Sequence, residues 1–355
     1  MPTGRKRKYE SWGYFCIIAI MITKFLYFPL LLSWTVLLCV SCAHQAHLQA
    51  RQGTDKFAIV RGKNIHYVEI GSGTPVILIP GLFSTYRTWD RMVPFLETKH
   101  HLLAIDNFGT GDSGIPVEGF NYSVNEQADM IIAMMDELNI SCCGLIGVSY
   151  GGMIALNIAA RYPDRVATVV CIEGGVIMPK NSPYKMLEQG LNTPIIGDTI
   201  ISIIQSGLFN EAITKDIMGS SWAEMKAEEQ SELIDIISGN IKAASRLTWL
   251  ALARALNNAS DFIEEAKSIT APILYLSGEK SSFREMTDAN IAFFKDNLPN
   301  ARLVSFEDGV HDLELQKPGE TAALVQEFIE QNAIQCKTTI STSLDIKQAA
   351  LHLTY

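Results

Sequence analysis

The chain has 355 residues, of which 48% are hydrophobic, and it carries a formal net charge of −9. This length and apolar content predict a packed, enzyme-sized core, large enough for one α/β domain with an insertion. Because the chain is acidic and has no basic run beyond its first ten positions, it is poorly suited to a phosphate backbone, and we expect no nucleic-acid partner.

Residues 1–42 differ in kind from the rest. The basic letters GRKRK precede an apolar stretch over 13–43, and the polar linker 43–56 follows. A charged start, an apolar core and a polar exit are typical of an export signal or a membrane anchor. The sequence therefore predicts an exported, membrane-associated protein.

The end of this stretch, VLLCVSC, resembles a bacterial lipoprotein signal, with Cys42 as the residue to be lipidated. It departs from that pattern at Cys39, where leucine is usual. A start at Met21 would give a short charged region, an apolar core and the same end. We expect a lipid anchor on Cys42; an uncleaved single-pass anchor near 25–42 and ordinary secretion are the alternatives.

From residue 57 onward, short β-type runs alternate with longer helical patterns. Strands are predicted over 57–60 and 65–70 (a hairpin), 75–80, 101–106, 143–148, 166–173, 272–277 and 301–306. Helices are predicted near 89–97 and over 123–138, 150–162 and 318–332. Ser123 and Glu126 are spaced as a capping box. This alternation predicts a mostly parallel sheet with helices on both faces.

The alternation stops near residue 176, and the next ninety or so residues show helical periodicity without convincing strands. We therefore predict a helical cap over 176–268, inserted into a core made of 57–175 and 269–333. A tail over 334–355 shows no clear pattern.

The letters GVSYGG place Ser149 after a buried strand and before a helix, which is the context of a nucleophile elbow. Such a turn strains the serine backbone, and Gly147 and Gly151 leave room for it. The helix that begins there stabilises negative charge at its N-terminus. The alternative is a glycine-rich turn without a catalytic role.

From 57 to 332 the sequence resembles the α/β-hydrolase superfamily. The matching pieces are PVILIPGLFSTYRTWD, AIDNFGTGDSG, GVSYGGMIALNIAARYPDRV and DGVHDLELQKPGE, in the family's order. The resemblance implies an α/β-hydrolase fold, with an eight-stranded sheet whose second strand is antiparallel. It also implies that Asp106, Gly109 and Gly111 shape a turn.

By the same resemblance, the oxyanion hole is formed by the backbone N–H groups of Tyr150 and Leu82. The family often has histidine before Gly81, whereas this chain has Pro80, which leaves Leu82 and Phe83 as alternatives.

His311 lies in the loop DGVHD, just past the last predicted strand. A residue there reaches the same sheet edge as Ser149, so we expect it to be the catalytic base. His66, His100 and His101 lie in early strands or loops, and we expect structural roles for them.

The acid of a triad is the uncertain member. In the family's common pattern it stands three residues after Gly278, but Ser281 occupies that place. Glu173 ends the sixth strand and is followed by two glycines, so it emerges beside the elbow. A buried carboxylate there needs a partner, which His311 would supply.

The segment CIEGGVIMP resembles the one that carries the acid in haloalkane dehalogenases, whose nucleophilic aspartate is replaced here by Ser149. Glu279 is the alternative acid, and Glu285 and Asp288 are more distant ones.

The sequence thus predicts a serine hydrolase that cleaves a carboxylic ester, esterase-like or lipase-like, and needs no cofactor. Within the predicted core over 57–333, the cysteines form no C-x-x-C pair or Cys/His cluster of zinc-like spacing, so no metal site is expected there. The apolar cap suggests a hydrophobic acyl substrate. Amide, thioester or carbon–carbon bond hydrolysis by the same triad, and an inactive binding protein on this fold, are the alternatives.

Overall fold

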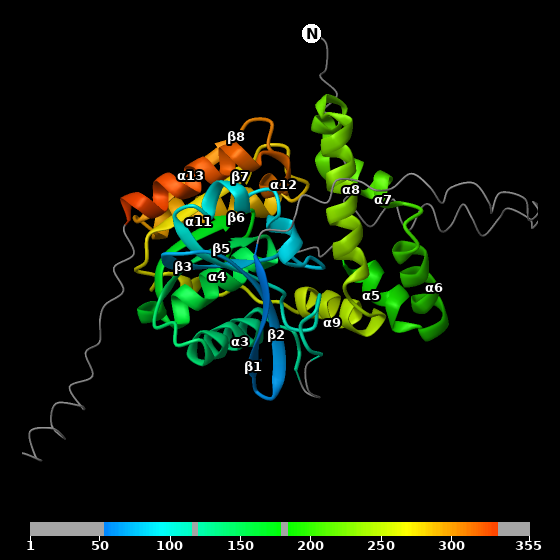
Figure 1. Ribbon diagram of the computed structural model, residues 1–355, viewed down its shortest axis with the longest axis horizontal. Helices are drawn as coiled ribbons and strands as arrows, with labels where there is room; N and C mark the ends of the chain where they lie inside the picture. The colour runs from blue at the N-terminus through cyan, green and yellow to red at the C-terminus, as the bar shows by residue number, and fades with distance from the viewer. Residues whose placement is uncertain (1–52, 116–119, 179–183, 333–355) are drawn as a thin grey trace, which may run out of the picture.

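The computed structural model describes residues 53–115, 120–178 and 184–332 (Figure 1). The predicted signal or anchor, with Cys42, lies outside these residues. Within them, no helix combines the length and apolar character needed to cross a membrane.

One sheet of eight strands organises the domain, in the order β1-β2-β4-β3-β5-β6-β7-β8. The strands are Thr54–Val60 (β1), Lys63–Gly71 (β2), Thr74–Ile79 (β3), His100–Ile105 (β4), Cys143–Val148 (β5), Val166–Ile172 (β6), Ile273–Gly278 (β7) and Ala301–Phe306 (β8). Strand β2 is antiparallel to both β1 and β4, and the remaining neighbours are parallel. The predicted mostly parallel sheet with an antiparallel second strand is confirmed.

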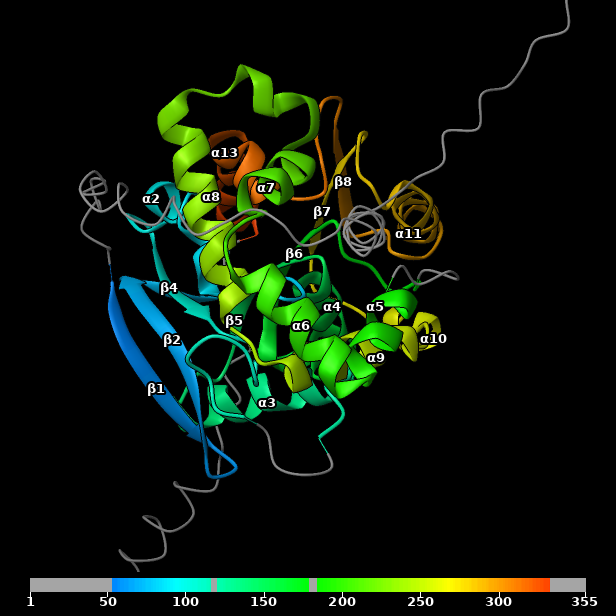
Figure 2. The ribbon, with the colours of Figure 1, turned by 90° about the vertical axis from the view of Figure 1, so that its right-hand side faces the viewer.

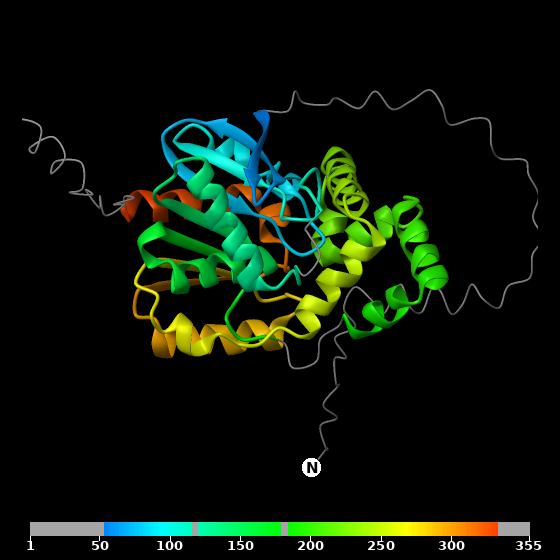
Figure 3. The same ribbon diagram turned by 90° about the horizontal axis from the view of Figure 1, so that it is seen from below.

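Helices cover both faces of the sheet (Figures 1 and 3). Those outside the insertion are Tyr86–Trp89 (η1), Val93–Leu96 (α2), Val124–Glu137 (α3), Tyr150–Arg161 (α4), Pro163–Arg165 (η2), Arg284–Asn297 (α11), Leu313–Gln316 (α12) and Pro318–Gln331 (α13). Successive strand residues point to opposite faces, so Ile77 packs in the cluster with α3 and α4, whereas Val76 packs in the cluster with α13. The core is therefore two apolar layers, one on each side of the sheet.

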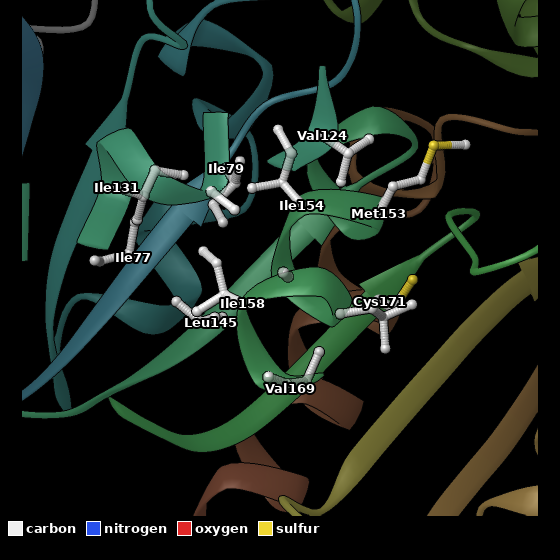
Figure 4. Close-up of a cluster of buried hydrophobic side chains, with 14 of the residues drawn as sticks. Ile77, Ile79, Val124, Ile131, Leu145, Met153, Ile154, Ile158, Val169 and Cys171 are labelled. Carbon is white, nitrogen blue, oxygen red and sulfur yellow. The ribbon is translucent and has the colours of Figure 1, made fainter. Parts of the chain in front are cut away.

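Figure 4 shows part of the first layer. Side chains from three adjacent strands meet the inner faces of α3 and α4, all of them buried: Ile77, Ile79, Leu145, Val169, Cys171, Ile131, Ile154 and Ile158. This packing fixes α4 against β5, and the turn between them carries Ser149.

Two local predictions differ from the structure. The helix expected near 89–97 is two short pieces, η1 and α2, and Pro94 lies in the first turn of α2. Proline lacks a backbone N–H, so a helix tolerates it at its start and not in its interior. The capping box is only half formed. Ser123 Oγ accepts the Glu126 N–H at 3.2 Å, but the Glu126 carboxylate accepts the N–H of Asn121 instead.

Between β6 and β7 the chain forms the cap helices: Lys185–Asn192 (α5), Pro194–Gln205 (α6), Asn210–Met218 (α7), Gly219–Glu224 (η3), Ala227–Lys242 (α8), Arg246–Asn257 (α9) and Ile263–Ala266 (α10). They have a small apolar core of their own, which includes Leu191, Leu233 and Trp249. Figure 2 views the molecule from the cap side, with α6 and α8 in front of the strands.

Candidate active site

The functional side chains predicted from sequence gather where β5, β6, β7 and β8 end. In the parallel register Val148 pairs with Ile172, Ile172 with Leu276, and Gly278 with Phe306. The carboxyl ends of parallel strands meet at one sheet edge, which is where open α/β sheets place their sites. Ser149, Glu173 and the loop that carries His311 therefore share this edge.

Ser149 occupies a strained turn between β5 and α4. Its φ is 53° and its ψ is −117°, and its N–H donates to the Ile172 carbonyl at 2.7 Å. Side chains rarely adopt this conformation, which costs on the order of 1–3 kcal/mol and persists at functional sites. The two flanking positions have no room for a side chain. A Cβ on Gly147 would lie 2.2 Å from the Gly151 oxygen, and a Cβ on Gly151 would lie 2.1 Å from the Ile79 oxygen.

Glu173 ends β6 with the same kind of backbone, at a φ of 52°, and its side chain is fully buried. Its Oε1 accepts the Gly278 N–H at 2.5 Å. Its Oε2 accepts the hydroxyls of Ser281 at 2.7 Å and Thr287 at 3.0 Å. A carboxylate with this many donors is satisfied as an anion and held in one orientation.

His311 Nδ1 lies 3.2 Å from Glu173 Oε2. With Nδ1–H donating to this carboxylate, Nε2 is the acceptor, which is the tautomer that a general base requires. Burial favours the neutral ring, but the hydrogen bond to Glu173 and the charges of Asp312 and Glu173 outweigh it and raise the pKa of His311. The Phe283 ring packs against the imidazole, with centroids 4.6 Å apart.

No hydrogen bond joins Ser149 to His311 within the residues that the structure describes. Catalytic hydrogen bonds of this type are often long in unliganded enzymes and shorten when substrate binds.

The other acids near β7 are placed differently from Glu173. Glu279 is exposed, its N–H donates to the Phe306 carbonyl, and it makes no hydrogen bond with His311. Glu285 is exposed, and Asp288 pairs with Arg284 at 2.5 Å.

Ser281 is not simply the occupant of a vacated position. Its hydroxyl both donates to Glu173 and accepts the Phe283 N–H at 3.2 Å. Sequence reasoning missed this contact and that of Thr287, although both residues lie within ten positions of Gly278.

The predicted oxyanion donors lie on both sides of Ser149. A Cβ placed on Gly81 would lie 3.6 Å from the Ser149 Cβ, so the loop that follows β3 runs beside the predicted nucleophile. In the described turns, loops and caps, neither the Leu82 N–H nor the Tyr150 N–H donates to a backbone carbonyl. Phe83, the alternative donor, has a φ of 60°.

Two cap helices, α8 and α9, contact the loop that follows β3. The Phe83 ring stacks on Trp249 of α9, with centroids 4.2 Å apart and planes 9° apart. Thr85 donates its hydroxyl to Asn240 Oδ1 of α8 at 2.6 Å, and its N–H to the same oxygen at 3.2 Å. Both of these residues are buried. The cap therefore directly contacts the loop that follows β3, which is the predicted oxyanion loop.

Glu314 is a further residue that sequence reasoning missed. It lies in α12, three positions after His311, with no exposed surface, and its Oε1 accepts the Thr88 hydroxyl at 2.9 Å. Burial and the negative charge of Asp312 raise the pKa of Glu314 well above its ordinary value. This buried carboxyl thus links the histidine loop to η1, which follows the predicted oxyanion loop.

Asp106 and His66 lie where β4 ends, but they bond to each other and not to the predicted triad; His100 and His101 lie at the start of that strand. His66 Nδ1 contacts Asp106 Oδ2 at 2.8 Å, and Asp106 Oδ1 accepts the Tyr86 N–H at 2.9 Å. His66, Asp106 and Asp112 have the proximity of a metal cluster, but the contacting atoms of His66 and Asp106 already hydrogen-bond to each other. His101 pairs with Glu69 at 2.8 Å, and burial lowers the pKa of His100.

Part of this chain is similar to known proteins. A family model described as the alpha/beta hydrolase fold matches residues 74–194. The chain is 28% identical over 143 residues to a cis-3-alkyl-4-alkyloxetan-2-one decarboxylase of Shewanella oneidensis, covering 39% of this chain and 45% of that protein. It is 31% identical over 128 residues to bifunctional epoxide hydrolase 2 of Sus scrofa, covering 36% of this chain and 23% of that protein. The chain thus spans less than half the length of these relatives.

Among solved structures, a membrane phospholipase A described as a bacterial virulence factor superposes with a TM-score of 0.62. The identity is 22%, and the superposition covers 79% of this chain and 87% of that one. This likeness shows a shared fold.

Proposed function

This chain belongs to the α/β-hydrolase superfamily of enzymes, and from that premise we propose that it is a serine hydrolase that cleaves a carboxylic ester through an acyl-enzyme. One observation carries the proposal: the buried Glu173 carboxylate contacts His311 Nδ1 at the sheet edge where Ser149 occupies a strained turn. A nucleophile, a base and an orienting acid at one edge are the elements of acyl transfer.

In the proposed reaction, Ser149 Oγ attacks the ester carbonyl while His311 Nε2 takes the hydroxyl proton. Glu173 stabilises the imidazolium that forms. The N–H groups of Leu82 and Tyr150 stabilise the oxyanion. His311 then protonates the departing alcohol, and the acyl group remains on Ser149. Water, deprotonated by His311, releases the carboxylic acid and restores the hydroxyl.

A serine at the elbow favours acyl chemistry over reactions that need a carboxylate nucleophile. The same three groups would also serve an amide, a thioester or a carbon–carbon bond, because the fold does not choose among them. We favour the ester because its hydrolysis needs no catalytic group beyond the nucleophile, the base, the acid and the oxyanion donors named above. The apolar core of the cap, including Trp249, favours a hydrophobic acyl group.

The decisive experiment is labelling with a fluorophosphonate probe, followed by hydrolysis of p-nitrophenyl esters of increasing chain length. We expect labelling that disappears in Ser149→Ala and persists in Ser268→Ala, a matched control at an exposed serine. A folded parent protein that resists the probe and cleaves no short ester would instead support an inactive binding protein.

We also propose that the protein is exported and held at a membrane by lipid on Cys42, as its sequence predicts. Processing that is blocked by globomycin and by Cys42→Ala supports this proposal. Unchanged processing in both experiments would exclude it and favour the uncleaved anchor.

A further inference from the structure

The cap presents apolar side chains to solvent on several helices that contact one another. Ile195 in α6 is 83% exposed, Leu208 after α6 is 80% exposed and Leu247 in α9 is 64% exposed; Met186 in α5 and Ile196 are also exposed. Isolated exposed apolar residues are ordinary, but several on adjoining helices mark an interaction surface. Figures 1 and 3 place α6 at the outer edge of the molecule, away from the sheet.

A groove of about 560 Å³ runs along the outer face of α6. Ile195, Ile203 and Leu208 provide its apolar lining, and Asp198, Thr199 and Ser206 are among its polar lining residues. These positions recur every three or four residues, so they share one face of the helix. The groove therefore belongs to the same outer surface as the exposed isoleucines.

Three of the four polar side chains that line this groove have partners within the cap. Thr199 donates to the Ile195 carbonyl at 2.8 Å, and Ser206 donates to the Ile203 carbonyl at 2.7 Å. Asp198 accepts from Arg246 at 2.6 Å. Hydroxyls that bond back to their own helix can enter an apolar medium without losing hydrogen bonds to water. Apart from the Asp198–Arg246 ion pair, the groove therefore offers few directional contacts to a protein partner, and its bonded hydroxyls have a low cost of desolvation by hydrocarbon.

We propose that this outer face of the cap, centred on α6, contacts the acyl region of a lipid bilayer. The predicted N-terminal membrane segment supplies the tether, because the linker between Cys42 and Thr54 spans at most about 40 Å when extended. A domain held this close meets the membrane at high effective concentration. Which face meets the membrane is then set by surface chemistry, and the cap carries five of the nine large apolar side chains that are exposed among the described residues. The proposal deepens the proposed function, since it presents the cap to substrates dissolved in the bilayer.

The test places a tryptophan on this face of the full-length chain, in dioleoylphosphatidylcholine vesicles with or without bromine on the acyl chains. Fluorescence of the parent is subtracted from that of Ile195→Trp. The matched control is Ile59→Trp, on an exposed isoleucine of β1 that is 62% exposed. We expect blue-shifted, bromine-quenched emission from position 195 and water-like emission from position 59.

Emission from position 195 that stays water-like would overturn the proposal. So would emission that is blue-shifted without bromine quenching, which would indicate a second copy of the chain on this face. These readouts do not depend on hydrolysis, so they distinguish a wrong surface from a wrong reaction. If the proposed function holds, Ile195→Asp with Leu208→Asp should lower the ratio of vesicle-ester to soluble-ester hydrolysis by about tenfold or more.

Discussion

The proposed acid offers the sharpest test, because Glu173→Gln keeps the shape of the side chain and removes its charge. The Gly278 N–H is a fixed donor 2.5 Å from Oε1, so the glutamine oxygen must face it. The opposite arrangement would set two donors against each other, at a cost of about 1–3 kcal/mol. The amide NH₂ group therefore takes the place of Oε2, facing Ser281, Thr287 and His311.

The consequence for His311 is a change of tautomer. Hydroxyls can rotate to accept from the new NH₂ group, and the imidazole accepts through Nδ1, so its proton moves to Nε2. An imidazole protonated at Nε2 cannot take the proton of Ser149. We expect kcat to fall by about 10³–10⁴-fold, equivalent to roughly 4–5.5 kcal/mol of transition-state stabilisation.

Steady-state hydrolysis of a p-nitrophenyl ester measures this loss, with circular dichroism and thermal unfolding as checks on the fold. Glu279→Gln is the matched control, because that side chain is exposed and makes no hydrogen bond with His311. A kcat of Glu173→Gln within about threefold of the parent value, or a larger loss in Glu279→Gln, would refute the assignment of the acid.

Three further expectations follow from the same contacts. Ser281→Asp in the Glu173→Gln background should recover at least about tenfold of the lost kcat, since the two positions serve one histidine; no recovery in a folded double variant would contradict a shared role. His311 must be neutral to act as a base and its pKa is raised, so kcat/KM of the parent should decline on the acid side with a midpoint above about 6.5. That midpoint should shift down in Glu173→Gln, and an unchanged midpoint would separate Glu173 from His311. Glu314→Gln should keep kcat within about threefold because the amide keeps the side-chain shape and can still accept the Thr88 hydroxyl. Glu314→Ala removes that acceptor and should cost about 2–4 kcal/mol of stability in denaturant unfolding; equal stability of the two variants would show that the Thr88 contact matters little.

Stability should also depend on pH through these groups. A histidine with a raised folded pKa stabilises the fold fully below about pH 6.5, and this contribution is lost as the pH rises through the folded value. A carboxyl with a raised pKa acts in the same direction, because the folded state keeps its proton above the ordinary glutamate range near 4.5. Glu314→Gln should therefore make the fall in stability above about pH 5 shallower, as thermal unfolding across pH would show.

The sequence could predict what depends on adjacent residues or on strand ends. The Ser149 turn follows from a few contiguous letters, because a strand, two glycines and a helix start determine its backbone. The mostly parallel sheet is predicted by the alternation of strand and helix patterns along the chain. Glu173 and His311 are 138 positions apart, yet their placement after β6 and β8 predicts that they share an edge.

Other contacts depend on the directions of side chains or on how the cap packs on the core. The periodicity of the sequence predicts neither of these. Ser281 stands where an acid was expected, and only the orientation of Glu173 makes its hydroxyl a donor to that carboxylate. The Phe83–Trp249 stack joins segments whose relative position is set by the packing of the whole cap. The helix expected near 89–97 broke into two pieces because one proline outweighed an apolar pattern.

The two hydrogen bonds that Thr85 donates to Asn240 bear on how this protein could be re-engineered. The cap is a single insertion between two strands, β6 and β7, so it could in principle be replaced by the cap of another protein. Here the amide oxygen of Asn240, on α8, accepts hydrogen bonds from both the hydroxyl and the N–H of Thr85, which is buried. A chimaera that brought a foreign cap without an acceptor at this point would leave two buried donors unpaired beside the oxyanion loop. Transplanted specificity would therefore require the recipient to keep Asn240 and the stacking partner of Phe83.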